Sequence, residues 1–201
     1  MDRIPPLEAP FTLEVAEQLG RMMPAGAPPI ALFRTFARNL EMARAMHGWG
    51  SYELSKRLSL SLRAREIAIL RTCARCGCEY EWGVHVASFA PRAELTPAQL
   101  RSLTAGLPDD ACWEEPERTL IAACDSLHAA ADVDDALWSR LAEHWSEAQI
   151  LDLLLLCGWY HAISFAARAA RVPLETFAPR FADYGGNDLK TSTSRAGNTE
   201  K

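Results

Sequence analysis

The sequence predicts an all-α fold, a single domain of roughly eight helices. Apolar residues recur at helical spacing along most of the chain, and capping residues precede several of these segments. No stretch alternates apolar and polar residues between hairpin turns, which argues against a sheet. With 201 residues, 49% of them hydrophobic, the chain is long enough for one sizeable core.

A proline-rich segment precedes most of the helices. Residues 1–29 contain six prolines, which remove backbone donors and restrict the residues before them. We therefore expect an extended arm around one short helix. Ile4, Leu7 and Phe11 are spaced along this arm, and such apolar side chains need a partner surface, which favours an oligomer.

The helical domain is predicted over residues 30–184. Its helices follow the apolar spacing and are expected at residues 30–46, 62–76, 78–89, from 97 onward, 117–131, 134–144 and 146–171. Ser61 caps the second of these helices, and capping boxes begin at Thr96 and Ser146. Residues 47–50, with the sequence His-Gly-Trp-Gly, are expected to form a helix end and a turn.

Charge and hydropathy exclude several classes of partner. The net charge of −5 and the pI of about 5.6 leave no basic footprint for nucleic acid or an anionic membrane. The longest apolar stretch, residues 150–167, contains Asp152, His161 and Ser164. Because burying such groups in a bilayer is costly, this stretch is predicted to be a core helix of the protein.

The two ends of the chain set further expectations. The N-terminal residues lack the basic and apolar regions of a secretory signal peptide, so a cytoplasmic location is expected. In that compartment the six cysteines are predicted to be thiols. The polar residues 185–201 have almost nothing to bury and are expected to form a disordered tail.

Four chemically active side chains fall on one face of the helix predicted near residues 78–89. Cys78, Glu81, Trp82 and His85 stand at positions i, i+3, i+4 and i+7, which share one stripe of a helix. Glu66 lies on the preceding helix, and a reversal of the chain at Gly77 would bring its carboxylate toward the same stripe.

These residue types suit proton transfer. A thiol at a helix N-terminus, as expected for Cys78, has a lowered pKa. His85 can move protons near neutral pH, and Glu81 can orient its ring. A carboxyl group partly buried by Tyr80 and Trp82 would stay protonated longer than usual and act as an acid. The alternative is structural: aromatics at i and i+4 are usually core, and a Glu–His pair one turn apart is often a solvated contact.

The same residues carry a family resemblance. The pattern Leu62-Arg63-x-Arg65-Glu66-x-Ala68-Ile69-Leu70, followed by Cys78-Glu79-Tyr80-Glu81-Trp82-x-x-His85, resembles the carboxymuconolactone decarboxylase family, also called alkylhydroperoxidase D-like. The resemblance implies an antiparallel helical bundle that assembles into homo-oligomers. It also implies a pocket near the motif helix, often at subunit contacts.

The sequence departs from the family pattern at one position. Thiol peroxidases of this family carry Cys-x-x-Cys-x-x-x-His, with a glutamate on the preceding helix. Glu66, Cys78 and His85 fall on the glutamate, first-cysteine and histidine positions, but the second-cysteine position is Glu81. A carboxylate cannot form the motif disulfide, which argues against the ordinary thiol-peroxidase cycle.

The other cysteines offer weaker candidates. Cys73 and Cys76 form a Cys-x-x-Cys at the end of the preceding helix, so a resolving role for Cys76 stays open beside that of a free buried thiol. No second paired knuckle follows and the five histidines are scattered, so neither a metal nor a cofactor is expected. Trp159 and His161 either form a second side of the pocket or belong to the core.

These observations lead to a functional hypothesis and two alternatives. The leading hypothesis is a cofactor-independent acid–base enzyme, catalysing decarboxylation or a related lyase or isomerase step on a small organic acid or lactone. The alternatives are hydroperoxide reduction by Cys78 and a non-catalytic small-molecule-binding module. The expected catalytic residues are Glu66, Cys78, Glu81 and His85, and the expected substrate-binding residues are Tyr80, Trp82, Trp159 and His161.

Overall fold

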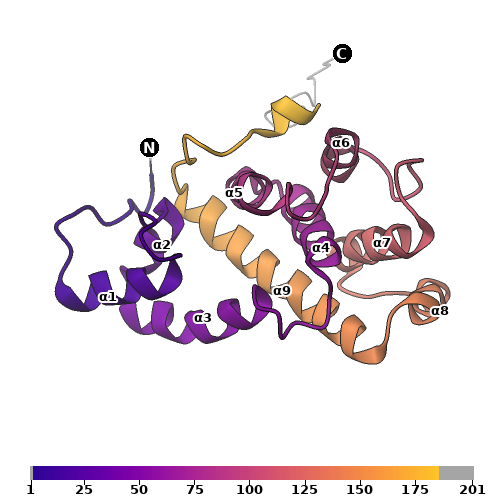
Figure 1. The fold of residues 1–201 in the computed structure, drawn as a ribbon, viewed down its shortest axis with the longest axis horizontal. Coiled ribbons are helices and arrows are strands. Elements are labelled where there is room, and N and C mark those ends of the chain that lie inside the picture. Colours follow the sequence, from indigo (N-terminus) through magenta and orange to yellow (C-terminus); the bar gives the residue numbers. More distant parts are fainter. Residues whose placement is uncertain (1, 186–201) are drawn as a thin grey trace, which may run out of the picture.

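The structure, a computed structural model, describes residues 2–185 and confirms the all-α prediction. Within these residues it contains nine α-helices, one short 3-10 helix and no strands (Figure 1). The helices are α1 (Leu13–Met22), α2 (Ala31–Phe36), α3 (Leu40–Glu53), α4 (Leu62–Arg75), α5 (Glu79–Phe89), α6 (Pro97–Ala105), α7 (Glu115–Ala130), α8 (Asp135–His144), α9 (Glu147–Ala170) and η1 (Phe181–Tyr184).

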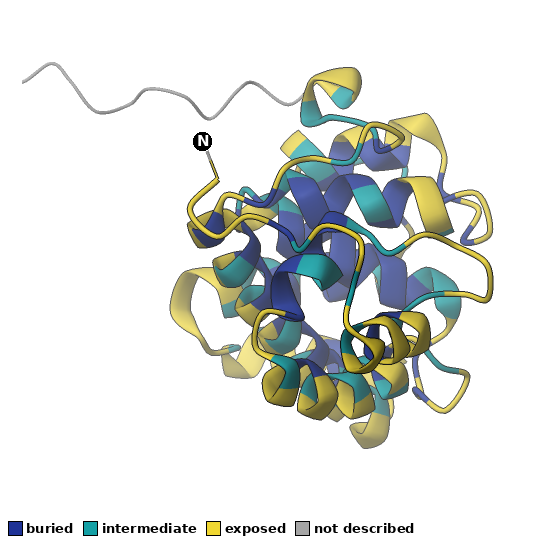
Figure 2. Cartoon of the chain, turned by 90° about the vertical axis from the view of Figure 1, so that its left-hand side faces the viewer, coloured by how far each residue is buried: buried dark blue, intermediate teal, exposed yellow. Residues whose placement is uncertain are grey.

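Helix α4 lies at the centre of the fold. Helices α5, α6, α7 and α9 all pack against it, so its side chains are buried around almost its whole circumference. The four consecutive residues from Ile67 to Leu70 have no exposed surface. Figure 2 shows buried positions concentrated in the inner helices, while the outer helices carry exposed residues. The central position of α4 explains why Glu66 and Arg71, both on it, are buried despite their charge.

The prediction of a single helix at residues 30–46 is wrong. The chain instead forms α2 and α3 with a turn at residues 37–39 between them. Asn39 caps α3, because its side-chain oxygen accepts a hydrogen bond from the Met42 backbone N–H at 3.1 Å. Residues 47–50, expected to form a turn, lie inside α3. The apolar spacing continues across the break, so periodicity alone does not reveal it.

The other predicted helix starts agree closely with the structure. The side chains of Ser61, Thr96 and Ser146 each accept a hydrogen bond from a backbone N–H of the first turn that they cap. The capping boxes at Thr96 and Ser146 are both complete. Helix α7 begins slightly earlier than expected, at Glu115, with Pro116 in its first turn.

Helix α9 is long and apolar enough to span a membrane by length and composition alone. In the structure it packs against α4 and α5. Its Asp152 carboxylate accepts hydrogen bonds from the Tyr52 hydroxyl at 2.7 Å and from Ser59. These contacts are those of a core helix of the protein, as the sequence predicts.

Both ends of the described chain pack on the helices. The backbone N–H groups of Arg3 and Ile4 donate to the Ala170 carbonyl, so the N-terminal arm lies on its own chain. Residues 172–184 cross over α5, where a Cβ atom on Gly83 would stand 2.5 Å from the Pro179 carbonyl oxygen. The predicted tail at 185–201 lies outside the described residues, apart from Gly185. All six cysteines are free thiols, as expected.

Candidate active site

A continuous hydrogen-bonded chain of side chains links helices α4, α5 and α9. Arg65 donates to Oε1 of Glu66 through Nε at 2.8 Å, and its Nη2 lies 2.7 Å from the same oxygen. The other oxygen, Oε2, lies 2.8 Å from Nδ1 of His85. On the opposite edge of the imidazole, Nε2 lies 3.0 Å from the Tyr160 hydroxyl. All four side chains are buried.

This order of partners fixes where the His85 proton sits. A carboxylate only accepts hydrogen bonds, and the Arg65 guanidinium stabilises Glu66 in that form. Nδ1 of His85 therefore carries the hydrogen and donates it to Glu66. In the neutral ring, Nε2 is then left with its lone pair, toward which Tyr160 donates its hydroxyl proton. Glu66 and Tyr160 thus hold the imidazole as a base.

Glu81 stands beside the same Nε2 edge of this imidazole that Tyr160 contacts. Its Oε2 lies 3.6 Å from Nε2 of His85, too far for a direct hydrogen bond but close enough for one on a small movement. Burial raises the pKa of Glu81, the neighbouring His85 opposes this rise and Glu66 adds to it. The sequence assigned the orientation of the ring to Glu81. The structure instead gives that position to Glu66 and leaves Glu81 as a candidate acid.

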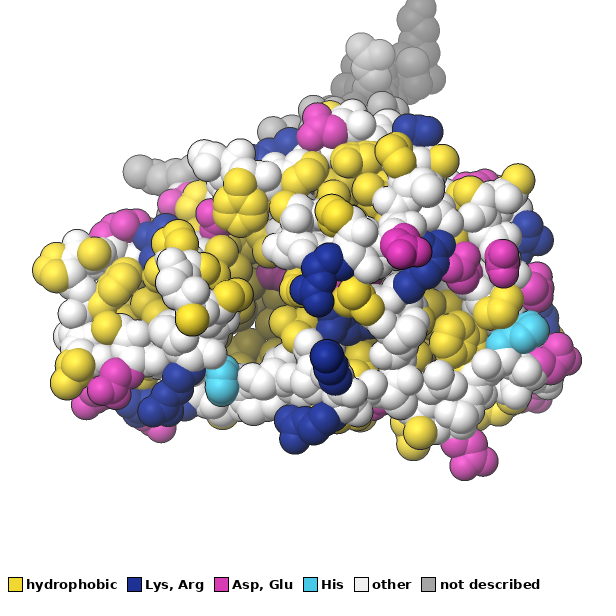
Figure 3. Space-filling model, in the orientation of Figure 1, with side chains coloured by type: hydrophobic (Ala, Val, Ile, Leu, Met, Phe, Trp, Pro, Cys, Tyr) yellow, Lys and Arg dark blue, Asp and Glu magenta, His cyan; other side chains and the backbone are white. Residues whose placement is uncertain are grey.

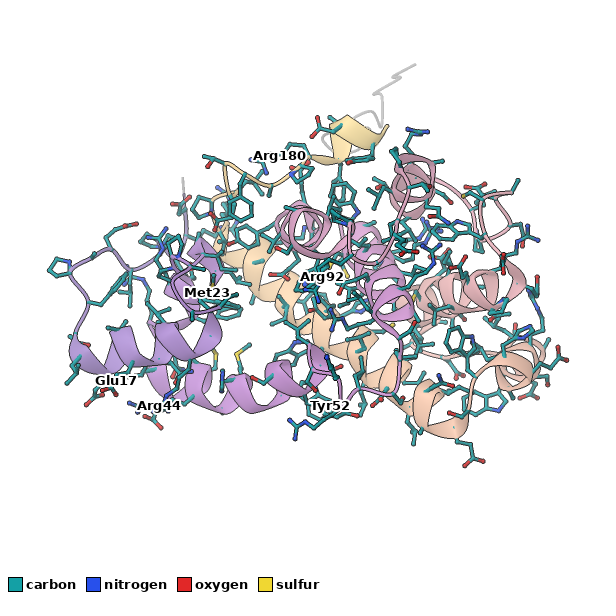
Figure 4. The ribbon with its side chains drawn as sticks, in the orientation of Figure 1. Glu17, Met23, Arg44, Tyr52, Arg92 and Arg180 are labelled. Carbon is teal, nitrogen blue, oxygen red and sulfur yellow. The ribbon has the colours of Figure 1, made fainter. Side chains whose placement is uncertain are left out.

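A cavity of about 720 Å³ opens in front of Glu81, His85 and Tyr160. Its walls are mostly apolar and include Phe33, Phe36, Met46, Trp159, Ile163 and Phe177. Figure 3 shows a hollow with hydrophobic side chains, between the α1–α3 part and the rest, with basic side chains beside it. Met23 and Arg92 line it from opposite sides (Figure 4). Its size lies within the usual range for small-molecule sites, about 300–1,000 Å³.

Cys78 lies behind this cavity and does not line it. It is the N-cap residue of α5 and has no exposed surface. Burial raises the pKa of its thiol to about 11, and the charge of Glu81 adds to the shift. The expected lowering of this pKa is therefore wrong, because the loss of solvent outweighs the favourable end of the helix.

Tyr80 and Trp82, expected to bind substrate, do not line the cavity. The Tyr80 hydroxyl donates to Glu175 at 2.7 Å and accepts from the Leu32 backbone N–H at 2.9 Å. The Trp82 ring packs against Phe181, with ring centroids 5.1 Å apart. Residues 81 and 82 differ by about 100° around a helix, so only one of them faces the cavity.

Of the two residues predicted on α9, Trp159 lines the cavity and His161 does not. Nδ1 of His161 lies 2.8 Å from the Cys157 carbonyl oxygen, and its Nε2 lies next to His128. Sequence reasoning missed Tyr160, although a signal was present. Its position continues the buried stripe of α9 through Leu156 and Ile163, and a buried hydroxyl needs a partner.

Comparisons with known proteins relate the chain to one family and to several solved structures. The model of the carboxymuconolactone decarboxylase family matches residues 41–123, which include Glu66, Cys78, Glu81 and His85. Over these residues, the chain is similar to the carboxymuconolactone decarboxylase family. No curated protein sequence matches the chain significantly.

Solved structures share the family fold at low identity. An uncharacterized peroxidase-related protein from Silicibacter sp. TM1040 is 16% identical, with a TM-score of 0.74, over 90% of this chain and 92% of its own. The debrominase Bmp8 is 18% identical, with a TM-score of 0.66, over 87% and 92%. A protein of unknown function from Agrobacterium tumefaciens, whose description relates it to antioxidant defence and AhpD, is 18% identical, with a TM-score of 0.63, over 70% and 96%.

Proposed function

We propose that this protein is a cofactor-independent enzyme that transfers protons to or from a small organic acid or lactone, as in a decarboxylation or a related lyase or isomerase step. One observation carries the proposal. His85 is held by Glu66 on one edge, and its other edge stands with Glu81 and Tyr160 at a cavity of small-molecule size. This arrangement places a base and an acid beside one ligand.

The chemistry follows from these positions. In a decarboxylation, loss of CO2 leaves an electron pair on carbon, which a carbonyl group of the substrate receives to form an enolate. The buried carboxyl group of Glu81 can donate the proton that converts this enolate to product. In an isomerisation, the Tyr160 hydroxyl would turn from Nε2 of His85 to the substrate, and the freed Nε2 would take a proton from carbon and return it at another position. The Tyr160 hydroxyl can donate to the developing oxyanion.

The cavity favours a small, largely apolar substrate with one anionic group. Apolar side chains form most of its wall, while Arg21 and Arg92 also contribute to its lining. These guanidinium groups can attract a carboxylate, which fits an organic acid. A cysteine-to-alanine variant of the debrominase Bmp8, 16% identical with a TM-score of 0.68, has been solved with 2,3,4-tribromopyrrole. A small unsaturated ring of that kind supports the same size class of ligand here.

Hydroperoxide reduction by Cys78 has less support. A buried thiol with a pKa of about 11 carries little thiolate at neutral pH, and Glu81 occupies the position of the resolving cysteine. Two other thiols lie near Cys78 in the sequence. Cys76 is the C-cap residue of α4, and Cys73 lies within that helix. Mass spectrometry after peroxide treatment tests this candidate, since it requires stoichiometric sulfenic acid or a Cys76–Cys78 disulfide.

A substrate screen in D2O tests the proposal. The library contains β-keto acids and unsaturated lactone acids, and the readouts are CO2 release and deuterium incorporated at carbon in the product. His85→Ala and Glu81→Gln should each lower turnover by about 10²-fold or more. His144→Ala, an exposed histidine on α8, is the control and should turn over normally. Equal turnover in all variants contradicts the proposal, and ligand binding without turnover favours a binding module.

A further inference from the structure

A second cluster of reactive side chains lies outside the cavity. Cys76 at the end of α4, His128 in the last turn of α7 and His161 in the middle of α9 converge on one point. The Cys76 sulfur lies 3.8 Å from Nδ1 of His128, which lies 3.0 Å from Nε2 of His161. All three atoms lie within 4.8 Å of one another. We propose that these three residues bind a zinc ion.

The distances suit such an ion. Zinc binds a thiolate at about 2.3 Å and an imidazole nitrogen at about 2.0–2.1 Å. In a tetrahedral site, those bond lengths place the ligand atoms about 3.3–3.6 Å apart. Two of the three separations, 3.0 and 3.8 Å, lie on either side of this range, and the third is no more than 4.8 Å, so side-chain movements would bring the atoms into place.

The hydrogen bonds around the cluster prepare the correct atoms as ligands. Nδ1 of His161 lies 2.8 Å from the Cys157 carbonyl oxygen, which can only accept, so Nδ1 carries the hydrogen. Nε2 of His161 is then free to bind a metal through its lone pair. Metal-binding histidines commonly donate their second N–H to a carbonyl in this way, because the bond fixes the tautomer and the ring.

His128 is the residue whose environment a metal would best explain. Its Nδ1 faces the lone pair of His161 and the Cys76 sulfur together. A zinc ion would take the place of the single proton that the two imidazoles share. It would bind Nδ1 of His128, Nε2 of His161 and the Cys76 sulfur.

The backbone holds the cysteine ligand firmly. The N–H of Cys76 donates to the Thr72 carbonyl at 2.9 Å, and its own carbonyl accepts from Arg168 at 2.7 Å. Nearby Arg75 would repel a cation, and Asp125, which binds both Arg75 and Arg71, offsets part of this charge. Because His128 is exposed, an ion can enter from solvent, and a fourth position stays available to water.

A thiolate with two imidazoles favours zinc over the hard cations magnesium and calcium, which prefer oxygen. An ion at this point would join α4, α7 and α9, which are distant in sequence but adjacent in the core. The proposed site therefore stabilises the fold and is independent of the acid–base chemistry proposed for the cavity.

Cobalt(II) substitution tests the site on the reduced, chelator-treated full chain. One equivalent of Co2+ should produce the near-ultraviolet charge-transfer band of a cobalt–thiolate bond, and added Zn2+ should abolish it. Cys76→Ser should eliminate the band, while His128→Ala and His161→Ala should weaken Co2+ binding by about 10–100-fold or more. His128 is exposed, so its variant should fold normally, and circular dichroism checks each variant.

Matched controls come from the same chain. Cys112→Ser and His144→Ala remove a thiol and an imidazole outside the cluster and should leave Co2+ binding unchanged. Glu81→Gln should do the same, which separates this site from the cavity. The absence of a one-to-one cobalt complex, or a charge-transfer band that survives in Cys76→Ser, would overturn the proposal.

Discussion

Oε2 of Glu66 lies 2.8 Å from Nδ1 of His85, and both side chains are almost completely buried. The two residues come from adjacent antiparallel helices, joined by a tight reversal in which Gly77 adopts a positive φ of 63°. Since Arg65 binds the other oxygen of Glu66, the three groups form a buried charged chain behind the cavity.

Glu66→Gln should destabilise the protein and lower activity. The amide leaves the buried Arg65 guanidinium without its counter-charge, and breaking a buried pair costs about 3–5 kcal/mol. Urea unfolding measures this loss. The control is Glu115→Gln, which removes an exposed partner of Arg140 and should leave stability unchanged within error. A Glu66→Gln variant as stable as the wild type would contradict a charged chain.

Tyr160→Phe should retain the fold and change the behaviour of His85. The variant removes the hydroxyl that donates to Nε2 of His85 at 3.0 Å. The loss of this buried hydrogen bond should lower the free energy of unfolding by about 1 kcal/mol. We expect turnover to fall by about 10-fold, which corresponds to the loss of one hydrogen bond worth about 1 kcal/mol, with a shifted pH–rate profile. An unchanged pH–rate profile would remove Tyr160 from the site.

Glu53→Gln should stabilise the protein above neutral pH. Neither carboxylate oxygen of Glu53 has a hydrogen-bond partner within the described residues, and burial, with the charge of Asp152 adding, raises its pKa to about 7. The folded state therefore binds more protons than the unfolded state between pH 4.5 and 7, and its stability falls as pH rises through this range.

The amide variant should remove this loss, which is on the order of 1–3 kcal/mol at pH 8. Thermal unfolding at pH 5 and pH 8 measures it. Glu17→Gln, on the exposed side of α1, is the control and should keep the wild-type pH dependence. If both variants show the same change in Tm between pH 5 and pH 8 as the wild type, ionisation of Glu53 does not destabilise the fold, and this interpretation is wrong.

Gly83→Ala should displace the segment that crosses α5. The added Cβ would stand 2.5 Å from the Pro179 carbonyl oxygen, and such overpacking costs about 1–3 kcal/mol. The matched control is Gly48→Ala in α3, where the added Cβ meets nothing within 4 Å and should stabilise the helix by about 0.5–1 kcal/mol. Opposite changes in Tm for the two variants are expected, and equal changes would contradict the packing described.

We propose that a second copy of the chain covers the outer face of α9. Exposed apolar side chains follow heptad spacing along it, at Leu151, Leu155 and Phe165, with the small residues Gly158 and Ala162 between them. Small central residues allow two such helices to approach closely. Light scattering should show an oligomer for the wild type and a monomer for Leu155→Glu with Phe165→Glu. A monomeric wild type at micromolar concentration would contradict self-association.

The fold could be predicted in most of its parts because its signals are local. Apolar spacing and caps such as Ser61 and Ser146 depend on neighbours within one or two turns. The break between α2 and α3 escaped prediction because the apolar pattern runs through it. Only the Asn39 side chain marks it, and asparagine is also common in other settings.

The candidate site could be predicted only where its residues share a motif. Spacing related Glu81 to His85, and the reversal at Gly77 brought Glu66 beside them. Tyr160 lies 75 positions from His85, and no local pattern records that contact. Tyr80 and Trp82 were expected at the cavity because they are close to Glu81 on the helix. The cavity contacts a narrower part of the helix surface, which includes Glu81 and His85 but neither aromatic residue. The Cys76, His128 and His161 cluster was missed because its members come from three distant helices.

Nitrogen-15 NMR of selectively labelled histidine tests the central claim most directly. The resonances of His85 are assigned by their loss in His85→Ala. At neutral pH the neutral ring of His85 should carry its hydrogen on Nδ1 and leave Nε2 bare, and Glu66→Gln should disturb this state. A ring protonated on Nε2, or one that Glu66→Gln leaves unchanged, would show that Glu66 does not hold His85 as a base at the cavity.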